Sequence, residues 1–182
     1  FTLPQLPVIP LGIHTQDFVY TPEDRSIART RLGVADGEVV VGYMGRLSFH
    51  AKAHPVSMYR SLELAAERTK KKIVVLECGW HGNKLIKRAF EEAQSVISPS
   101  IRYIYLDGRE SKNRDIMWAS TDIFCSFSDN IQETFGITPL EAMAAGIPVV
   151  VSDWDGYKES VEDGEQGFKV PTVSAEPGHG ED

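Results

Sequence analysis

One stretch of this chain, residues 133–153, limits its possible folds more than any other. It reads ETFGITPLEAMAAGIPVVVSD. Thr138 is suited to a helix N-cap, Pro139 to the first helical position, and Glu141 follows the cap by three residues, which is the pattern of a capping box. Gly146 stands where a left-handed residue commonly ends a helix. We therefore expect a short helix of about two turns here.

An apolar strand follows this helix directly. Residues 147–151 read IPVVV, a continuous run rich in β-branched side chains, which is typical of a strand covered on both faces of a parallel sheet. The backbone amides of Phe135 to Leu140 are then gathered at a helix N-terminus beside the end of such a sheet. That position favours an anion, because free N–H groups and the helix dipole both point toward it.

Strand and helix patterns alternate along the rest of the chain. This alternation predicts an α/β class, specifically a Rossmann-like three-layer α/β/α fold with a mainly parallel, doubly wound sheet. Ligands of such sheets bind at the carboxyl ends of the strands. The expected strands are 6–10, 39–44, 73–78, 101–106, 122–127, 147–151 and 167–170; the expected helices are 21–33, 55–69, one after Gly82 that ends near Val96, 111–120, 138–146 and 157–161.

The length and the net charge of the chain limit the number of domains and the kinds of partner that it can have. With 182 residues the chain suits one domain, which we place at 1–172, with a disordered tail at 173–182. A net charge of −7 argues against a nucleic-acid partner, so phosphate binding must come from a few placed cations and backbone amides. Cys78 and Cys125 lie in apolar runs and are expected to be reduced and buried, which fits a cytoplasmic protein.

Several nucleotide-binding and catalytic motifs are missing from the sequence. No G-x-G-x-x-G follows a strand, and no G-x-x-x-x-G-K-[ST] is present, so neither a dinucleotide site nor a P-loop is indicated. There is also no G-x-S-x-G elbow and no Cys/His spacing typical of a metal site. No metal ligands are therefore assigned.

Three segments of the sequence resemble a known family. Residues 133–153, together with Gly45-Arg46-Leu47 and VIPLGI at 8–13, resemble the carboxyl-terminal, donor-binding half of a family-4 retaining GT-B glycosyltransferase, of the glycosyl transferases group 1. The most specific feature is the glutamate pair Glu133 and Glu141, which frames FGITPL. The resemblance implies a nucleotide-sugar substrate, linked to UDP or GDP. It also implies transfer of a hexosyl-type sugar to an acceptor hydroxyl, with retention and without a metal or other cofactor.

The resemblance assigns parts of the donor to particular residues. It implies that Glu141 binds the ribose hydroxyls, and a carboxylate can indeed accept hydrogen bonds from a vicinal diol. The capping box alone would also explain Glu141. Glu133 corresponds to the residue that contacts the donor sugar near the reacting centre. The amides expected to face the sugar and the diphosphate belong to Phe135, Gly136, Ile137 and Thr138.

Two cations correspond to the basic pair of the family. Arg46 and Lys52 would neutralise the diphosphate leaving group, and fixed cations can stabilise that developing charge. They lie one residue further apart than in the family, so the loop carries one extra residue. Taken alone, Lys52 could also be an exposed surface lysine, although this is the less favoured alternative. No role is assigned to the flanking histidines, His50 and His54.

Further expectations concern the neighbouring strand ends. Gly79 is expected near the donor. Asp107 and Gly108 belong to the loop whose backbone would read the nucleobase. Trp80 is expected to cover the sheet edge, although it could also stack on a ligand.

The chain has no room for the acceptor-binding, amino-terminal half of such an enzyme. We therefore expect it to bind a nucleotide-sugar without transferring the sugar efficiently by itself, and we expect any membrane contact to come through the missing half. Two alternatives remain. One is a sugar-nucleotide epimerase of the same architecture, against which the glutamate pair argues. The other is a non-catalytic nucleotide-binding module, which the presence of Glu133, Glu141 and Arg46 disfavours.

Overall fold

The structure, a computed structural model, describes residues 11–129, 133 and 135–173. The strand expected at 6–10, the first half of the VIPLGI motif and all but the first residue of the expected tail lie outside these residues. None of the helices in the described part of the chain is both long and apolar enough to cross a membrane.

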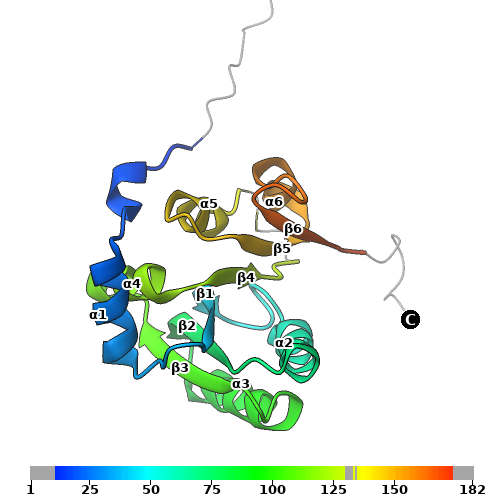
Figure 1. The fold of residues 1–182 in the computed structure, drawn as a ribbon. Coiled ribbons are helices and arrows are strands. Elements are labelled where there is room, and N and C mark those ends of the chain that lie inside the picture. The colour runs from blue at the N-terminus through cyan, green and yellow to red at the C-terminus, as the bar shows by residue number, and fades with distance from the viewer. Residues whose placement is uncertain (1–10, 130–132, 134, 174–182) are drawn as a thin grey trace, which may run out of the picture.

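A parallel sheet of six strands forms the centre of the described part (Figure 1). Its spatial order is β3-β2-β1-β4-β5-β6, and every neighbouring pair is parallel. The order reverses between β1 and β4, and such a switch point is where doubly wound sheets bind ligands. The predicted fold class is therefore confirmed. The strands are β1 (Val39–Leu47), β2 (Ile73–His81), β3 (Arg102–Asp107), β4 (Ile123–Ser126), β5 (Val149–Asp153) and β6 (Gly167–Pro171).

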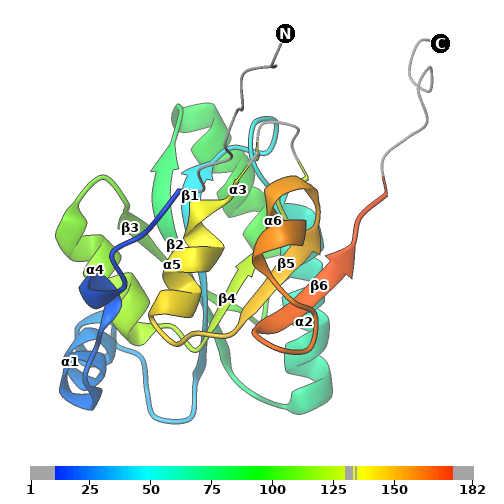
Figure 2. The same ribbon diagram turned by 90° about the horizontal axis from the view of Figure 1, so that it is seen from above.

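Helices lie on both faces of the sheet (Figures 1 and 2). Helices α2 and α3 cover one face, and α4, α5 and α6 cover the other, with α1 packed against α4. The short 3-10 helix η1 contacts α5. Their bounds are η1 (Thr15–Phe18), α1 (Pro22–Leu32), α2 (Pro55–Thr69), α3 (Lys84–Ile97), α4 (Ser111–Ser120), α5 (Ile137–Ala144) and α6 (Asp155–Ser160).

Local capping signals explain where several helices begin and end. Thr21 and Asp24 form a reciprocal capping box at the start of α1, and Gly33 ends that helix in the left-handed conformation, as predicted. The predicted bounds of α2 and α4 are also confirmed.

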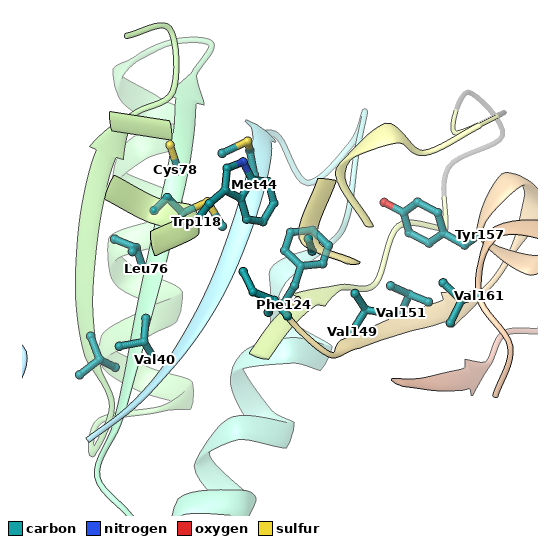
Figure 3. Close-up of a cluster of buried hydrophobic side chains, with 14 of the residues drawn as sticks. Val40, Met44, Leu76, Cys78, Trp118, Phe124, Val149, Val151, Tyr157 and Val161 are labelled. Carbon is teal, nitrogen blue, oxygen red and sulfur yellow. The ribbon is translucent and has the colours of Figure 1, made fainter. Parts of the chain in front are cut away.

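Each face of the sheet packs into its own apolar core. Val41 and Val75 point toward α2 and α3, while Val40, Phe124 and Val149 point toward α4, α5 and α6 (Figure 3). Because successive strand residues alternate between faces, a continuous run of β-branched residues fills both cores at once.

The first two strands extend further than predicted. β1 continues to Leu47, and β2 runs through residues 79–81, where the sequence predicted a turn. Gly45 and Gly79 pair in register, and a Cβ built at Gly79 would lie 1.9 Å from the Gly45 carbonyl oxygen. Pairing continues there because two glycine backbones can approach more closely than side chains would permit. In contrast, β4 is shorter than predicted, and β5 begins at Val149 rather than Ile147.

The predicted start of α5 was wrong. The helix begins at Ile137, with Gly136 as its N-cap at φ 73°, so Thr138 is not the cap. The Thr138 side chain instead lies close to the buried Tyr157 hydroxyl, where it opposes the rise that burial causes in the pKa of Tyr157. The expected end is confirmed: Gly146 is left-handed at φ 72°, and the amides of Gly146 and Ile147 donate back into the last turn, as in a Schellman motif.

Candidate functional site

Three of the side chains singled out by the sequence, Arg46, Lys52 and Glu133, lie at the carboxyl ends of β1 and β4. Arg46 lies near the end of β1, and the loop that follows carries Lys52. Glu133 and the first residues of α5 follow β4. Because β1 and β4 are adjacent and parallel, these two loops leave the same edge of the sheet at its switch point.

Lys52 and Glu133 form an ion pair. The Lys52 amide donates to the Ser48 carbonyl over 3.0 Å, which turns the loop back toward the sheet. Lys52 Nζ lies 2.8 Å from Glu133 Oε2, and Ser128 Oγ donates to the same oxygen over 3.3 Å. The Glu133 side chain is 14% exposed and that of Lys52 31%, so this pair is better shielded from water than an ordinary surface pair.

Arg46 is half-buried beside this pair. Among the residues that the structure describes, no carboxylate is paired with its guanidinium. Burial strongly raises the pKa of the neighbouring Tyr43 hydroxyl, Glu133 adds to the rise, and Arg46 opposes it. Both charges therefore act on the same buried hydroxyl, although they come from different loops.

The start of α5 completes this side of the site. Gly136 is the buried N-cap of α5, and Ile137, the first residue of the helix, is 41% exposed. Sequence reasoning missed two residues that hold this region. Ser128 donates a hydrogen bond to Glu133, and Tyr157 is hydrogen-bonded to Ser126. Both contacts join residues of unlike type across loops, and no local pattern indicates them.

Glu141 occupies a separate cavity further along α5. The cavity has a volume of about 230 Å³ and lies between η1, α4 and α5. Burial raises the pKa of Glu141, and the nearby Arg114 guanidinium opposes that rise. Burial, with several nearby carboxylates, raises the pKa of Tyr20 to about 12. The lining residues are Asp17, Phe18, Tyr20, Arg114, Asp115, Trp118 and Glu141.

Gly79, Asp107 and Gly108 lie together at the ends of β2 and β3. The Gly108 amide donates to the Gly79 carbonyl over 3.0 Å. Hydrogen bonds from Arg109 lower the pKa of Asp107 to about 2, and the Asp107 carboxylate is occupied by that arginine. The Asp107 carbonyl also accepts hydrogen bonds from the Glu110 amide and from Asn113 Nδ2. Trp80 is 39% exposed, so it only partly covers the sheet edge.

Sequence comparison identifies the family. The family model of the glycosyl transferases group 1 matches residues 24–177, which is most of the chain. The chain belongs to the glycosyl transferases group 1. The resemblance stated from the residues alone is thereby confirmed.

Relatives of this group 1 chain are much longer. It is 30% identical over 153 residues to the D-inositol 3-phosphate glycosyltransferase of Nocardia farcinica, which covers 83% of this chain and 33% of that protein. The corresponding protein of Corynebacterium efficiens is 31% identical over 156 residues, covering 84% and 36% respectively. The chain thus spans about a third of the length of these relatives.

Solved structures share the fold. Anabaena HepE in complex with UDP and glucose has a TM-score of 0.69 at 24% identity, covering 88% of this chain and 41% of that one. WaaG, a glycosyltransferase involved in lipopolysaccharide biosynthesis, has a TM-score of 0.70 at 21% identity, covering 91% and 42%. The C-terminal domain of the group 1 protein LpcC from Francisella tularensis has a TM-score of 0.64 at 19% identity, covering 90% and 82%. The group 1 chain therefore has the extent of a domain that has also been solved by itself.

Proposed function

We propose that this chain is the donor-binding domain of a retaining, metal-independent glycosyltransferase. The full-length protein would transfer a hexosyl-type sugar from a nucleoside diphosphate to an acceptor hydroxyl. The bond between the anomeric carbon and the diphosphate breaks, a bond to the acceptor oxygen forms on the same face, and a nucleoside diphosphate and a proton are released. One observation carries the proposal: Arg46, Lys52 and the start of α5 surround Glu133 at the switch point of a parallel sheet.

The diphosphate is assigned to the cationic side of the site. Its departure places negative charge on the phosphate oxygens, and Arg46 and Lys52 can stabilise that charge from fixed positions. The amides of Phe135, Gly136 and Ile137 add partial positive charge at the start of α5. These protein groups supply what a divalent cation would otherwise supply, which is the reason for proposing metal independence.

The two glutamates are assigned to the two sugar rings of the donor. Glu133 would accept from hydroxyls of the transferred sugar, after its ion pair with Lys52 has been replaced by a Lys52–phosphate contact. Glu141 would accept from the ribose diol at the cavity that it lines. The Thr138 amide belongs to the first turn of α5 and would face the diphosphate.

The nucleobase is assigned to the ends of β2 and β3. The Asp107 side chain is held there by Arg109, and Gly108 has no side chain. Recognition would therefore use the Asp107 and Gly108 backbone. UDP is the first nucleotide to test, because it is the nucleotide in the HepE complex, and GDP is the second.

The acceptor site is assigned to a part of the protein outside this chain. The relatives are about three times as long, which accommodates a second, amino-terminal domain. The chain alone is therefore expected to bind donor without efficient transfer. Neither a sugar-nucleotide epimerase nor a non-catalytic module is favoured by the family match. Cys78 and Cys125 are free and buried, which supports a cytoplasmic location.

Calorimetric titration of the chain tests this proposal. UDP, GDP, ADP and their sugar conjugates would be compared in EDTA and in magnesium. We expect one nucleoside diphosphate to bind in EDTA as well as in magnesium, and to bind more weakly as salt rises, because the contacts are ionic. Binding of none of them at millimolar concentration would overturn the donor-site assignment.

A further inference from the structure

Tyr157 lies in α6, directly behind the candidate site, and nothing in the sequence pattern assigns it a function. Its side chain is 1% exposed, and its ring belongs to the core shared by α4, α5 and α6 (Figure 3). A hydroxyl in such a core must find hydrogen-bond partners, because an unpaired buried polar group costs free energy. The partners of this hydroxyl therefore show which elements of the fold Tyr157 holds together.

The Tyr157 hydroxyl is hydrogen-bonded to another element of the fold. Ser126 Oγ, at the end of β4, lies 3.0 Å away, and the Thr138 side chain of α5 lies close enough to oppose the rise in the pKa of Tyr157. One buried hydroxyl thus connects α6 with the end of β4 and lies against the first turn of α5. Glu133 lies in the segment between β4 and α5, and this contact joins α6 to the residue at which that segment begins.

The ring of Tyr157 also fixes the backbone at Gly136. A Cβ built at Gly136 would lie 2.1 Å and 2.4 Å from two ring carbons, so the ring fills the space where a side chain would point. The neighbouring Gly156 amide donates to the Glu133 carbonyl over 3.4 Å, and a Cβ at Gly156 would lie 2.5 Å from Phe135 Cα. Residues of α6 therefore support this segment through both a ring and a backbone contact.

We propose that Tyr157 is a positioning residue for the diphosphate end of the donor site. Its ring holds Gly136, and its hydroxyl is anchored to Ser126, so that the amides at the start of α5 keep a fixed direction toward the anion. Fixed donors stabilise an anion better than mobile ones, because no reorganisation accompanies binding. Tyr157 itself is buried and makes no contact with the donor. This inference rests on the proposed function, since it concerns the same site.

The test compares Tyr157→Phe with Tyr103→Phe in the whole chain. Tyr103 is also a tyrosine whose hydroxyl is hydrogen-bonded, to Ser98, but it lies on the opposite face of the sheet. We expect Tyr157→Phe to weaken binding of both UDP and inorganic diphosphate about three- to tenfold, the usual effect of one hydrogen bond. Tyr103→Phe should bind both as the wild type does. Equal affinity of folded Tyr157→Phe and wild type would overturn the inference.

A second variant covers the case in which Tyr157→Phe does not fold. Ser126→Ala removes one anchor of the Tyr157 hydroxyl and leaves the ring in place. A loss of affinity similar for UDP and inorganic diphosphate supports the inference. Wild-type affinity for both in folded Ser126→Ala, as in folded Tyr157→Phe, contradicts it.

A measurement without ligand separates this inference from the proposed function. If the wild-type chain binds neither UDP nor inorganic diphosphate, the proposed function fails. Positioning is then judged from ¹⁵N order parameters of the Gly136, Ile137 and Leu140 amides, which report fast backbone motion. Lower values in Tyr157→Phe but not in Tyr103→Phe support it, and unchanged values overturn it.

Discussion

Lys52 Nζ lies 2.8 Å from Glu133 Oε2, although 81 positions separate the two residues in the sequence. The lysine proposed to bind the diphosphate is therefore already paired with a carboxylate in the ligand-free chain. An incoming diphosphate has to replace that carboxylate. Donor affinity thus depends on the strength of this pair as well as on the contacts formed afterwards.

Glu133→Gln should therefore tighten binding of UDP lacking a sugar. The change removes a negative charge beside the diphosphate position and releases Lys52. We expect the affinity for UDP to rise about two- to fivefold at low salt, because a partly exposed ion pair contributes only a small free energy. Calorimetry with UDP measures this effect, and Glu67→Gln, an exposed site in α2, is the control. Unchanged or weaker UDP binding would contradict the prediction. Sugar transfer by the full-length protein should fall in the same variant.

Arg46→Gln should weaken UDP binding about tenfold or more, because it removes a charged hydrogen-bond donor from the diphosphate. The dependence of affinity on salt should also become smaller, since one ionic contact is lost. Arg68→Gln, in the last turn of α2, has the same charge change away from the site and should bind as the wild type does. If both variants lost affinity equally, only the net charge of the chain would matter.

Gly79→Ala should destabilise the fold, whereas Gly82→Ala should not. A Cβ at Gly79 would lie 1.9 Å from a backbone oxygen of Gly45, but a Cβ at Gly82 would meet only the Ile86 side chain at 3.6 Å. We expect a loss of about 2 kcal/mol or more for Gly79→Ala and a change within about 0.5 kcal/mol for Gly82→Ala. Urea unfolding of both variants measures the difference. Equal stabilities would show that β1 and β2 can separate at this point without cost.

The buried carboxyl of Glu77 should make stability depend on pH. Burial raises its pKa to about 7, although hydrogen bonds from Tyr59 and Gln94 oppose the rise. Because the folded state holds this proton more tightly than the unfolded state, the contribution is fully present below the unfolded pKa near 4.5. It is lost as pH rises toward 7.

Glu77→Gln removes this titration while keeping the size of the side chain. Relative to the wild type, the variant should gain up to about 3 kcal/mol of unfolding free energy between pH 4.5 and pH 8. Urea unfolding at several pH values measures the gain, with Glu67→Gln as the exposed control. A difference between variant and wild type that stays constant with pH would contradict the prediction.

The sequence predicted those parts of the structure that depend on neighbouring residues. The Thr21–Asp24 box and the ends at Gly33 and Gly146 follow from contacts within one helical turn, so a local pattern indicates them. The alternation of strands and helices likewise predicted the sheet. These features need no knowledge of which distant segments meet.

The errors have a common physical origin in distant contacts. β2 passes its predicted end because Gly79 pairs with Gly45, and the N-cap of α5 is Gly136, against which the Tyr157 ring packs, rather than Thr138. The roles of Lys52 and Glu133 were predicted from a resemblance, but their pairing was not. No spacing along the chain specifies a contact between residues so far apart in sequence.

The last strand described, β6, also limits how the sheet can grow. It lies at the edge, where unpaired backbone groups could accept a strand from another molecule, and its Phe168 side chain is 64% exposed. Lys169 lies 3.7 Å from Asp153 of the neighbouring strand, so its charge is paired, but Pro171 has no amide to donate. Pro171 thus removes one backbone donor from β6, which weakens pairing with a further strand at that position.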